Sequence, residues 1–446
     1  MQSPIIKRLF SDKISTILTL AIIFLILLRI VILPLSPPGF YVDEAATGAH
    51  VVAMVKHQTN AHGQSWPLFS PSLGGGFTTP VYLYPLSLWA AIFGLSELSL
   101  RAFSQFVTII AILFVGLSIR LWLNKRAGLI AVIIGLALPW GWLQGSLAWD
   151  PVMAPLMVSL AFFGWLLLLT RKDKTNILIG NIILIVALIL LAYVYPPYWV
   201  SAPILLITAY ATLYFKKRVS IRQIAYAGLA STILVLPLIN FILQPNTLNR
   251  SSSVSIFHNA SFIQAIGKFI VNLAVLINPA FLFVNGDYNI RHSTGFEGML
   301  GYGAIIPIVF IIYLLVSKKH KKSKKILTAN ETFLVTTGAV GYLISIIGSA
   351  LTIEGQPHSL RACGAWPFVI IILVVSWSAI LRSKNQWLKS ITIIVFIIGT
   401  LAYAFNLAIC YPVNSSYDFN VPERTKILSN QPVQYLPLAL QYYETR

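Results

Sequence analysis

Acidic residues are scarce in this chain, and two of them stand side by side. Only 13 of the 446 residues are Asp or Glu, yet Asp43 and Glu44 are adjacent, just after the first apolar stretch. A carboxylate placed there could act as a general base that takes a proton from a hydroxyl group. Asp43 could instead cap a helix that begins at Glu44, whose charge would suit the helix dipole. The cap explains the pair locally, and the rest of the chain favours the base.

A second carboxylate, Asp150, lies between two later apolar stretches. It could assist Asp43 or orient an acceptor, so we expect Asp43 and Asp150 to be the catalytic pair. Because Pro151 follows, Asp150 also fits a helix cap that precedes a proline in the first helical position.

Two short segments carry Arg beside His, namely Arg291-His292 and His358 to Arg361. An arginine fork matches the oxygens of a phosphate, and a nearby histidine can donate to them as well. Each arginine could instead extend along apolar surface to the membrane interface, and Glu354 could pair with Arg361. The residues expected to bind substrate are Glu44, Arg291, His292, His358 and Arg361.

Histidines near the acidic pair raise the question of a metal. His50 and His57 are seven residues apart, roughly 10 Å along a helix, whereas zinc-binding pairs on a helix are spaced by four. We therefore expect no metal cofactor, although a divalent cation held by Asp43, Glu44 or Asp150 stays open.

The composition defines the class of protein. Hydrophobic residues make up 57% and charged residues 10%, with a mean hydropathy of +0.79, which is typical of a multi-pass membrane protein. The net charge of +19 comes mostly from short basic clusters between apolar spans. That pattern indicates cytoplasmic loops rather than nucleic-acid binding. The sequence has no Walker A loop and no Rossmann glycine fingerprint, which disfavours ATP-driven transport and the use of nucleotide sugars.

The apolar stretches predict an all-α protein with about eleven transmembrane helices. The expected spans are Ile14–Leu35, an uncleaved anchor, then Ala102–Leu123, Gly128–Trp142, Val152–Thr170, Ile177–Tyr193, Pro203–Phe215, Ile224–Leu243, Ile305–Val316, Phe333–Ala350, Trp366–Leu381 and Ile391–Ala408. Pro80–Phe93 is too short to cross comfortably and is expected on the outer surface, as is a short amphipathic helix at Ala45–Val55.

The basic loops orient these spans. The Lys318–Lys325 run is expected in the cytoplasm, with two long outer regions at about 36–101 and 244–300 and a short outer tail at 412–446. The acids that then fall outside are Asp43, Glu44, Glu97, Asp150, Asp287, Glu297, Glu354, Asp418, Glu423 and Glu444. All the histidines except His320 fall outside as well. This concentration of acids and imidazoles on one face predicts a site at the outer surface.

With these residues in view, the chain resembles the GT-C superfamily of polytopic glycosyltransferases, in particular the bacterial branch related to protein O-mannosyltransferases and aminoarabinose transferases. The resemblance lies in segments 38–46 (PGFYVDEAA), 79–86 (TPVYLYPL) and 93–101 (FGLSELSLR), and further in Asp150, 286–293 (GDYNIRHS) and 357–361 (PHSLR). Relatives often have a lysine where Thr78-Thr79 stand, and many have an arginine where this chain has Gly145-Ser146.

The resemblance implies a GT-C-like module over residues 1–411 in the bacterial cytoplasmic (inner) membrane. It implies transfer of a sugar from a polyprenyl-phosphate donor to a lipid, glycan or protein hydroxyl on the extracytoplasmic face, with inversion and with Asp43 as base. Membrane lipids are the other expected partners, and no nucleic acid is expected. The alternatives are a glycan ligase or polymerase that uses a pyrophosphate-linked donor, and a non-enzymatic lipid or glycan transporter.

Overall fold

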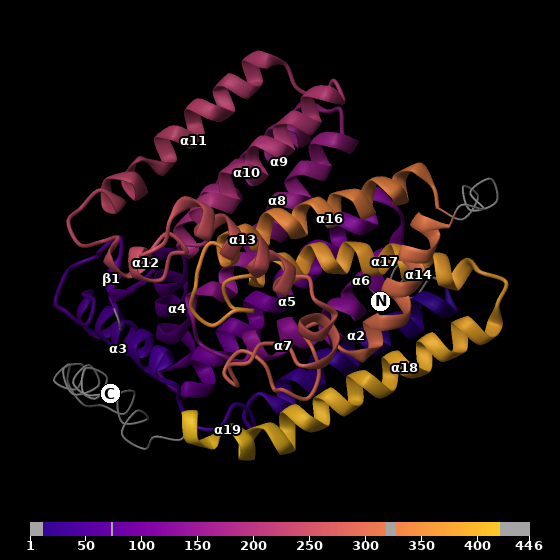
Figure 1. Ribbon diagram of the computed structural model, residues 1–446, viewed down its shortest axis with the longest axis horizontal. Helices are drawn as coiled ribbons and strands as arrows, with labels where there is room; N and C mark the ends of the chain where they lie inside the picture. Colours follow the sequence, from indigo (N-terminus) through magenta and orange to yellow (C-terminus); the bar gives the residue numbers. More distant parts are fainter. Residues whose placement is uncertain (1–11, 73–74, 318–326, 420–446) are drawn as a thin grey trace, which may run out of the picture.

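The computed structural model describes residues 12–72, 75–317 and 327–419 (Figure 1). Its helices are α2 (Lys13–Ile32), α3 (Val42–His57), α4 (Pro80–Phe93), α5 (Glu97–Trp122), α6 (Lys125–Ala137), α7 (Pro139–Gly145), α8 (Met153–Thr170), α9 (Lys174–Val194), α10 (Tyr198–Phe215), α11 (Ile221–Ile242), α12 (Asn249–Ser253), α13 (Phe262–Leu276), α14 (Ile305–Val316), α16 (Ala329–Ala350), α17 (Trp366–Arg382), α18 (Gln386–Phe405) and α19 (Tyr411–Phe419). Single-turn helices are η2 (Asp150–Val152), η3 (Ala280–Val284), η4 (Tyr302–Ala304), η5 (Cys363–Ala365) and η6 (Asn406–Cys410). Two two-residue strands, β1 (Ser70–Pro71) and β2 (Phe77–Thr78), pair antiparallel in the first outer region.

Polar caps set the starts of several long helices. The Ser96 side chain accepts from the Ser99 amide at the start of α5, and Asn124 accepts from Ala127 at the start of α6. Such a cap satisfies a backbone donor that has no partner inside its own helix, which is why the apolar stretch begins its helix there.

The all-α membrane fold expected from the sequence is confirmed. Within the described residues, ten helices are long and apolar enough to cross a membrane, or eleven if the bent pair α6–α7 counts as one span. The expected span Gly128–Trp142 is that bent pair, which turns by 59° where Pro139 begins α7. Proline has no amide hydrogen to continue the ladder of α6, so the break falls there. The surface helix α4 has the bounds expected from the sequence.

The second outer region differs from the expected loop because it contains a long apolar segment. Phe262–Val284 is one of the ten candidate spans, whereas the helix Tyr302–Val316 is shorter than a full span. Lys268 and Asn272 interrupt the apolar run of α13, and this concealed the helix in the sequence. The segment still begins and ends at one end of the molecule. Ile256 donates to Leu351 O at 3.0 Å before it, and Ser359 donates to Asp287 at 2.8 Å after it.

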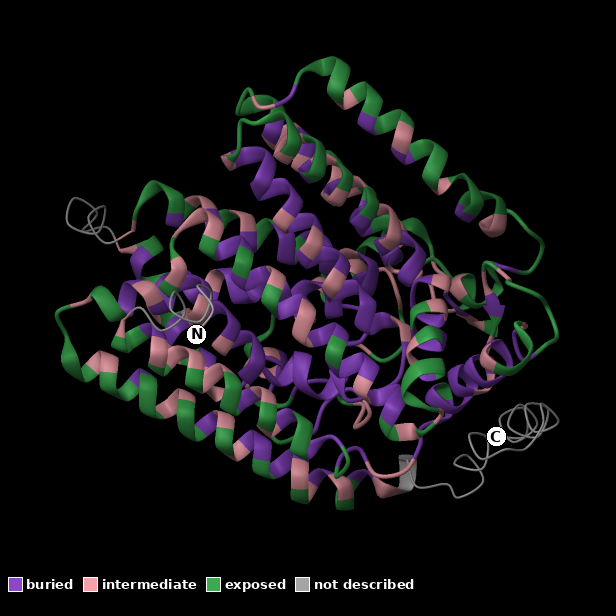
Figure 2. Cartoon of the chain, turned by 180° about the vertical axis from the view of Figure 1, so that it is seen from behind, coloured by how far each residue is buried: buried purple, intermediate pink, exposed green. Residues whose placement is uncertain are grey.

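The helices are arranged around a buried centre. In the most apolar stretch of α8 and of α17, 83% of the residues are buried. In the corresponding stretch of α2 and of α11, only 17% are buried (Figure 2). Apolar side chains on the outer helices, such as Leu229 and Ile233 of α11, are exposed where lipid chains would lie.

The long helices separate two ends with different chemistry. At one end, the Trp122 indole donates a hydrogen bond to Asn330 O, and Arg382 forms an ion pair with Glu331. The other end carries α3, β1, α12 and α19, on the left of Figure 1. The Lys318–Lys325 loop and residues 420–446 of the expected tail lie outside the described residues.

Candidate functional site

Helix α3 presents Asp43 to solvent from its first turn. The helix begins at Val42 with Tyr41 as its N-cap residue, so the interpretation of Asp43 as the cap is wrong. Tyr41, Val42 and Glu44 are buried, whereas Asp43 is exposed. A carboxylate in the first helical turn is stabilised by the helix dipole, which favours its ionised form.

Glu44 turns inward from the same helical turn and is completely buried. Its carboxylate accepts from Arg101 Nε at 2.8 Å and Nη2 at 2.7 Å, and from the amides of Ala148 at 2.8 Å and Tyr41 at 3.0 Å. These four donors fill its acceptor positions, so the geometry does not favour the expected contact of Glu44 with substrate. The same bonds fix the start of α3 to α5 and to the backbone two residues before Asp150.

Asp150 is held by a segment distant in the sequence. It is the first residue of η2, and its Oδ2 accepts from the Thr79 amide at 3.1 Å, just before α4. Its carboxylate therefore braces α4 in addition to any local role at its own helix. Asp43 lies close enough for its charge to act on Asp150, so the two expected catalytic carboxylates lie in the same region of the molecule.

Arg361 is buried in the turn between α16 and α17. Its guanidinium donates to Glu354 at 2.7 Å and also bonds Tyr195, which lies within electrostatic range of Asp43 and Asp150. Glu354 receives a second arginine, Arg250 of α12, at 2.8 Å. Partial burial alone would raise the pKa of the Glu354 carboxyl, but the two arginines outweigh burial and lower it. The pairing of Glu354 with Arg361, which the sequence left open as an alternative, is present in the structure.

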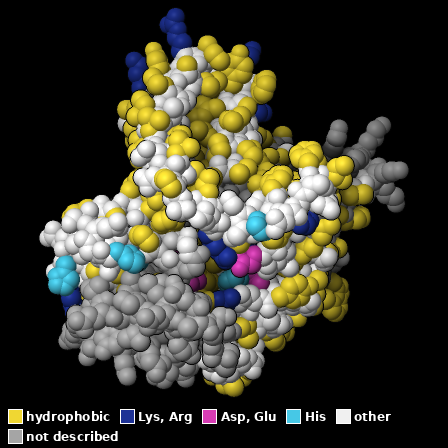
Figure 3. All heavy atoms as spheres, turned by 60° about the vertical axis from the view of Figure 1, so that its left-hand side comes forward, with side chains coloured by type: hydrophobic (Ala, Val, Ile, Leu, Met, Phe, Trp, Pro, Cys, Tyr) yellow, Lys and Arg dark blue, Asp and Glu magenta, His cyan; other side chains and the backbone are white. Residues whose placement is uncertain are grey.

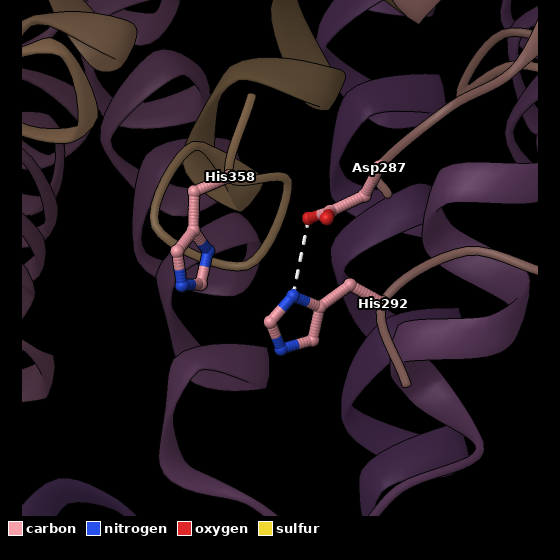
Figure 4. A group of neighbouring side chains, drawn as sticks. All are labelled: Asp287, His292 and His358. Carbon is pink, nitrogen blue, oxygen red and sulfur yellow. Dashed lines mark hydrogen bonds and ion pairs between the residues drawn. The ribbon is translucent and has the colours of Figure 1, made fainter. Parts of the chain in front are cut away.

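Asp287, His292 and His358 form a buried cluster beside these residues (Figure 4). Asp287 Oδ2 accepts from the Ser359 amide at 2.8 Å and lies 3.1 Å from His292 Nδ1, and the two imidazole rings are 4.7 Å apart. Burial lowers the pKa of His358 well below its ordinary value, and nearby His292, Arg361 and Arg291 act in the same direction. His358 is therefore neutral at physiological pH.

Arg291 joins this cluster to the start of α3. Its guanidinium stacks on the ring of Tyr41 at 4.8 Å, and the ring of His292 lies 5.7 Å from that of Trp149. Tyr41 and Trp149 are close in sequence to Asp43 and Asp150, so all seven predicted site residues converge on one end of the molecule. Figure 3 shows acidic, basic and imidazole side chains gathered around a hollow on this face.

Sequence reasoning missed Tyr195 and Arg250. Tyr195 stands in an aromatic, proline-rich turn that is also typical of a membrane interface, so its composition gave no separate signal. Arg250 did carry a signal, since a basic residue in a region expected outside is an exception to the charge rule.

The histidines of the first outer region have a different role. His50 Nε2 and His62 Nε2 lie 3.0 and 3.1 Å from the same Pro71 carbonyl, and the Ala61 amide donates to His50 Nδ1 at 3.2 Å. Burial lowers the pKa of His50 to about 4. Both ring nitrogens of His50 thus engage loop backbone, and His57 is exposed in the last turn of α3.

No family model and no curated protein matches this sequence. Among solved structures, the chain is similar to the Archaeoglobus fulgidus oligosaccharyltransferase in its apo form, with a TM-score of 0.51 and 14% identity over 98% of this chain and 61% of that one. The same enzyme tethered to an acceptor peptide gives 0.50 and 15% over 88% and 55%, and its complex with Zn and sulfate gives 0.50 and 16% over 96% and 57%. ArnT from Cupriavidus metallidurans gives 0.47 and 12% over 94% and 86%.

The matches to the oligosaccharyltransferase establish a shared fold. Over 98% of its length the chain has the fold of the apo oligosaccharyltransferase from Archaeoglobus fulgidus. It spans about 55 to 61% of the length of the oligosaccharyltransferase chains in their peptide-tethered and apo forms.

Proposed function

We propose that this chain is a membrane glycosyltransferase that moves a sugar from a polyprenyl-phosphate donor to an acceptor hydroxyl, with inversion and with Asp43 as general base. The observation that carries the proposal is the juxtaposition of two groups of opposite charge. Asp43 is exposed in the first turn of α3, where its charge acts on Asp150. Tyr195 lies within electrostatic range of both carboxylates and contacts Arg361. The GT-C fold is that of enzymes that transfer sugars.

The reaction needs a base on one side of the sugar and cations on the other. Asp43 takes the proton of the acceptor hydroxyl as its oxygen attacks the anomeric carbon, while the bond from that carbon to the donor phosphate breaks. The polyprenyl phosphate leaves with growing negative charge, which Arg361 and Arg291 stabilise. Attack opposite to the leaving group inverts the anomeric centre.

Asp150 is proposed as a positioning carboxylate for the acceptor or for Asp43. Its bond to the Thr79 amide and the bonds of Glu44 to Arg101 and Ala148 fix the pair in the free protein. Preformed geometry of this kind lowers the cost of aligning acceptor and donor in the transition state.

A hydrocarbon-lined cavity suits the lipid part of the donor. A cavity of about 220 Å³ lies among α8, α9, α10, α16 and α17, with Phe162, Trp165, Leu205, Phe333 and Ile344 in its lining. Ile344 is six residues, about 9 Å along α16, from the outer end of that helix at Ala350. An isoprenoid chain whose phosphate lies near Arg361 would run along this part of the bundle.

The proposed location is the bacterial cytoplasmic membrane, with the site on the extracytoplasmic face. The support is the separation of charge, because Arg126, Lys216 and Arg382 lie at the end opposite the site. The acceptor is proposed to be a lipid, glycan or protein hydroxyl.

The test is transfer by purified Asp43→Asn protein, assayed with a panel of polyprenyl-phosphate hexoses and pentoses and with pyrophosphate-linked counterparts. Turnover should fall by about 10²–10⁴, the usual contribution of a general base, while donor binding and thermal stability stay near those of the wild type. Asp173→Asn is the matched control. Asp173 also stands at a helix start, but at the opposite end of the molecule, and that variant should turn over normally.

Near-normal transfer by well-folded Asp43→Asn protein would remove Asp43 from the mechanism. Activity only with pyrophosphate-linked donors would favour the ligase or polymerase alternative. Binding of the lipid-linked sugars without any transfer would favour a transporter.

A further inference from the structure

The cluster of Asp287, His292 and His358 has the composition of a metal centre. The three side chains each offer a ligand atom, and these atoms lie within 4.8 Å of one another. All three side chains are at least nine-tenths buried. Two of them come from the second outer region and the third from the turn after α16, so the cluster joins segments that are about 70 residues apart in the sequence.

The chemistry of the donors selects the class of ion. Two imidazole nitrogens and one carboxylate oxygen suit Zn²⁺ and similar transition metals, whereas Mg²⁺ and Ca²⁺ prefer oxygen ligands throughout. Three protein ligands with one open position is the arrangement of catalytic and substrate-binding zinc sites. Tetrahedral zinc needs ligand atoms about 3.3 Å apart, so the cluster has to contract by at most roughly 1.5 Å along any edge.

The surroundings hold the ligands in the required form. The Ser359 and Asn289 amides donate to the two oxygens of Asp287 at 2.8 and 2.9 Å, which orients the carboxylate as outer-shell partners do in known metal sites.

Two arginine side chains lie near the cluster, and each already contacts another residue. Arg361 is paired with Glu354, and Arg291 is stacked on Tyr41. Their charge opposes a bare cation, but it favours a cation whose open position holds an anionic oxygen. A phosphate that contacts the arginines could also reach the ion.

We propose that Asp287, His292 and His358 bind one zinc-class divalent cation, with the fourth position open to water or to a phosphate oxygen. This site differs from the Asp43–Asp150 pair and from the His50–His62 pair. It goes beyond the proposed glycosyl transfer, because an ion can be bound and measured with no donor or acceptor present.

The experiment is metal binding by the purified full-length protein after chelation, with Zn²⁺ alone and with Co²⁺ alone. Elemental analysis should find about one zinc per chain, and Co²⁺ should give the visible absorption of a tetrahedral site. Zinc should also raise the thermal stability. In His292→Ala and Asp287→Asn the affinity should fall by more than about 100-fold, beyond what the loss of an outer-shell partner costs.

Two controls decide where the ion is bound. His258→Ala removes an exposed histidine of the same outer region and should bind zinc like the wild type. Asp43→Asn should also keep the ion. Zinc lost in Asp43→Asn but retained in His292→Ala would overturn the proposal and place the ion on the carboxylate pair.

A ligand swap guards against loss of binding through misfolding. His358→Cys supplies a thiolate in place of the imidazole, and with Co²⁺ it should bind and add a sulfur-to-metal charge-transfer band. His358→Ala should show neither. Absence of that band in a folded His358→Cys protein, or wild-type zinc affinity in all the site variants, would contradict the site. Each outcome is independent of whether the protein transfers sugar.

Discussion

Two regions of this molecule pair a glutamate with arginine and use the pair differently. Beneath the start of α3, Glu44 and Arg101 form an ion pair at 2.7 Å whose side chains are 0% and 5% exposed. In the turn after α16, Glu354 pairs with Arg361 at 2.7 Å and with Arg250 at 2.8 Å, and its side chain is 46% exposed. The chemical groups are the same, and their access to water differs.

That difference separates a structural pair from an exchangeable one. Glu44 has all its acceptor positions filled and no path to solvent, so the pair can only hold α3, α5 and the segment before Asp150 together. Glu354 stays in contact with water, where ion pairs contribute little to stability and are readily replaced. Under the proposed function, a donor phosphate would take the place of Glu354 on Arg361.

The largest expected effect comes from breaking the buried pair. Glu44→Gln leaves Arg101 charged without a counter-ion in a dry environment and should cost about 3–5 kcal/mol in the free energy of unfolding. Thermal or denaturant unfolding of the detergent-solubilised protein measures it.

A double variant provides the matched control. Replacing both Glu44 and Arg101 with Met removes the orphaned charge and should recover much of the lost stability. If Glu44→Gln were as stable as the wild type, the pair would not hold this region.

Glu297 adds a third glutamate to this comparison. It is buried, and it forms no ion pair with an arginine within the described part of the chain. Burial raises its pKa to about 7, against the partial offset of a bond from the Tyr302 amide. The folded state therefore binds a proton that the unfolded chain has already lost, and stability falls as pH rises between about 4.5 and 7. Glu297→Gln removes the titrating group, so up to about 3 kcal/mol of the pH-dependent change in the free energy of unfolding should disappear. The variant should be most stable relative to the wild type near pH 8.

The measurement is thermal unfolding of both proteins from about pH 5 to pH 8. Glu354→Gln is a control whose difference from the wild type should stay constant over this range. Because the pKa of Glu354 is lowered from 4.5, its contribution to stability is lost only at pH values below this range. A constant difference between Glu297→Gln and the wild type across this range would show that Glu297 is ionised throughout.

The smallest expected effect is at the exposed pair. Arg361→Ala should weaken donor binding by about 1.5–3 kcal/mol, the scale of a charged hydrogen bond, with little change in acceptor binding. Binding of the donor under single-turnover conditions measures it directly.

Arg250→Ala is the control that distinguishes a contact of Arg361 with the donor phosphate from structural support of the turn after α16. It removes the second, exposed partner of Glu354 and should change unfolding free energy by no more than about 1 kcal/mol. Unchanged donor binding in Arg361→Ala would leave that arginine with a structural role alone, through its bonds to Glu354 and Thr352.

Much of the fold was predictable because each apolar span carries its own signal. The bounds of α4 and the break at Pro139 follow from local composition, since apolar length and proline chemistry act within a few residues. Helix α13 was missed because Lys268 and Asn272 break its apolar run. Asn272 is satisfied by the Ala350 and Thr352 carbonyls, a contact that only the folded chain supplies.

The sequence by itself determined the membrane class, the scarcity of acids and the convergence of Asp43, Asp150 and Arg361 at one end, because basic loops and apolar lengths act locally. Only the tertiary structure decided that Asp43 faces solvent while Glu44 is buried against Arg101. It also decided that Asp287 meets His358 across more than 70 residues. Burial and long-range pairing arise only when helices pack together. Neighbouring residues in the sequence do not determine which face of a helix a distant segment will cover.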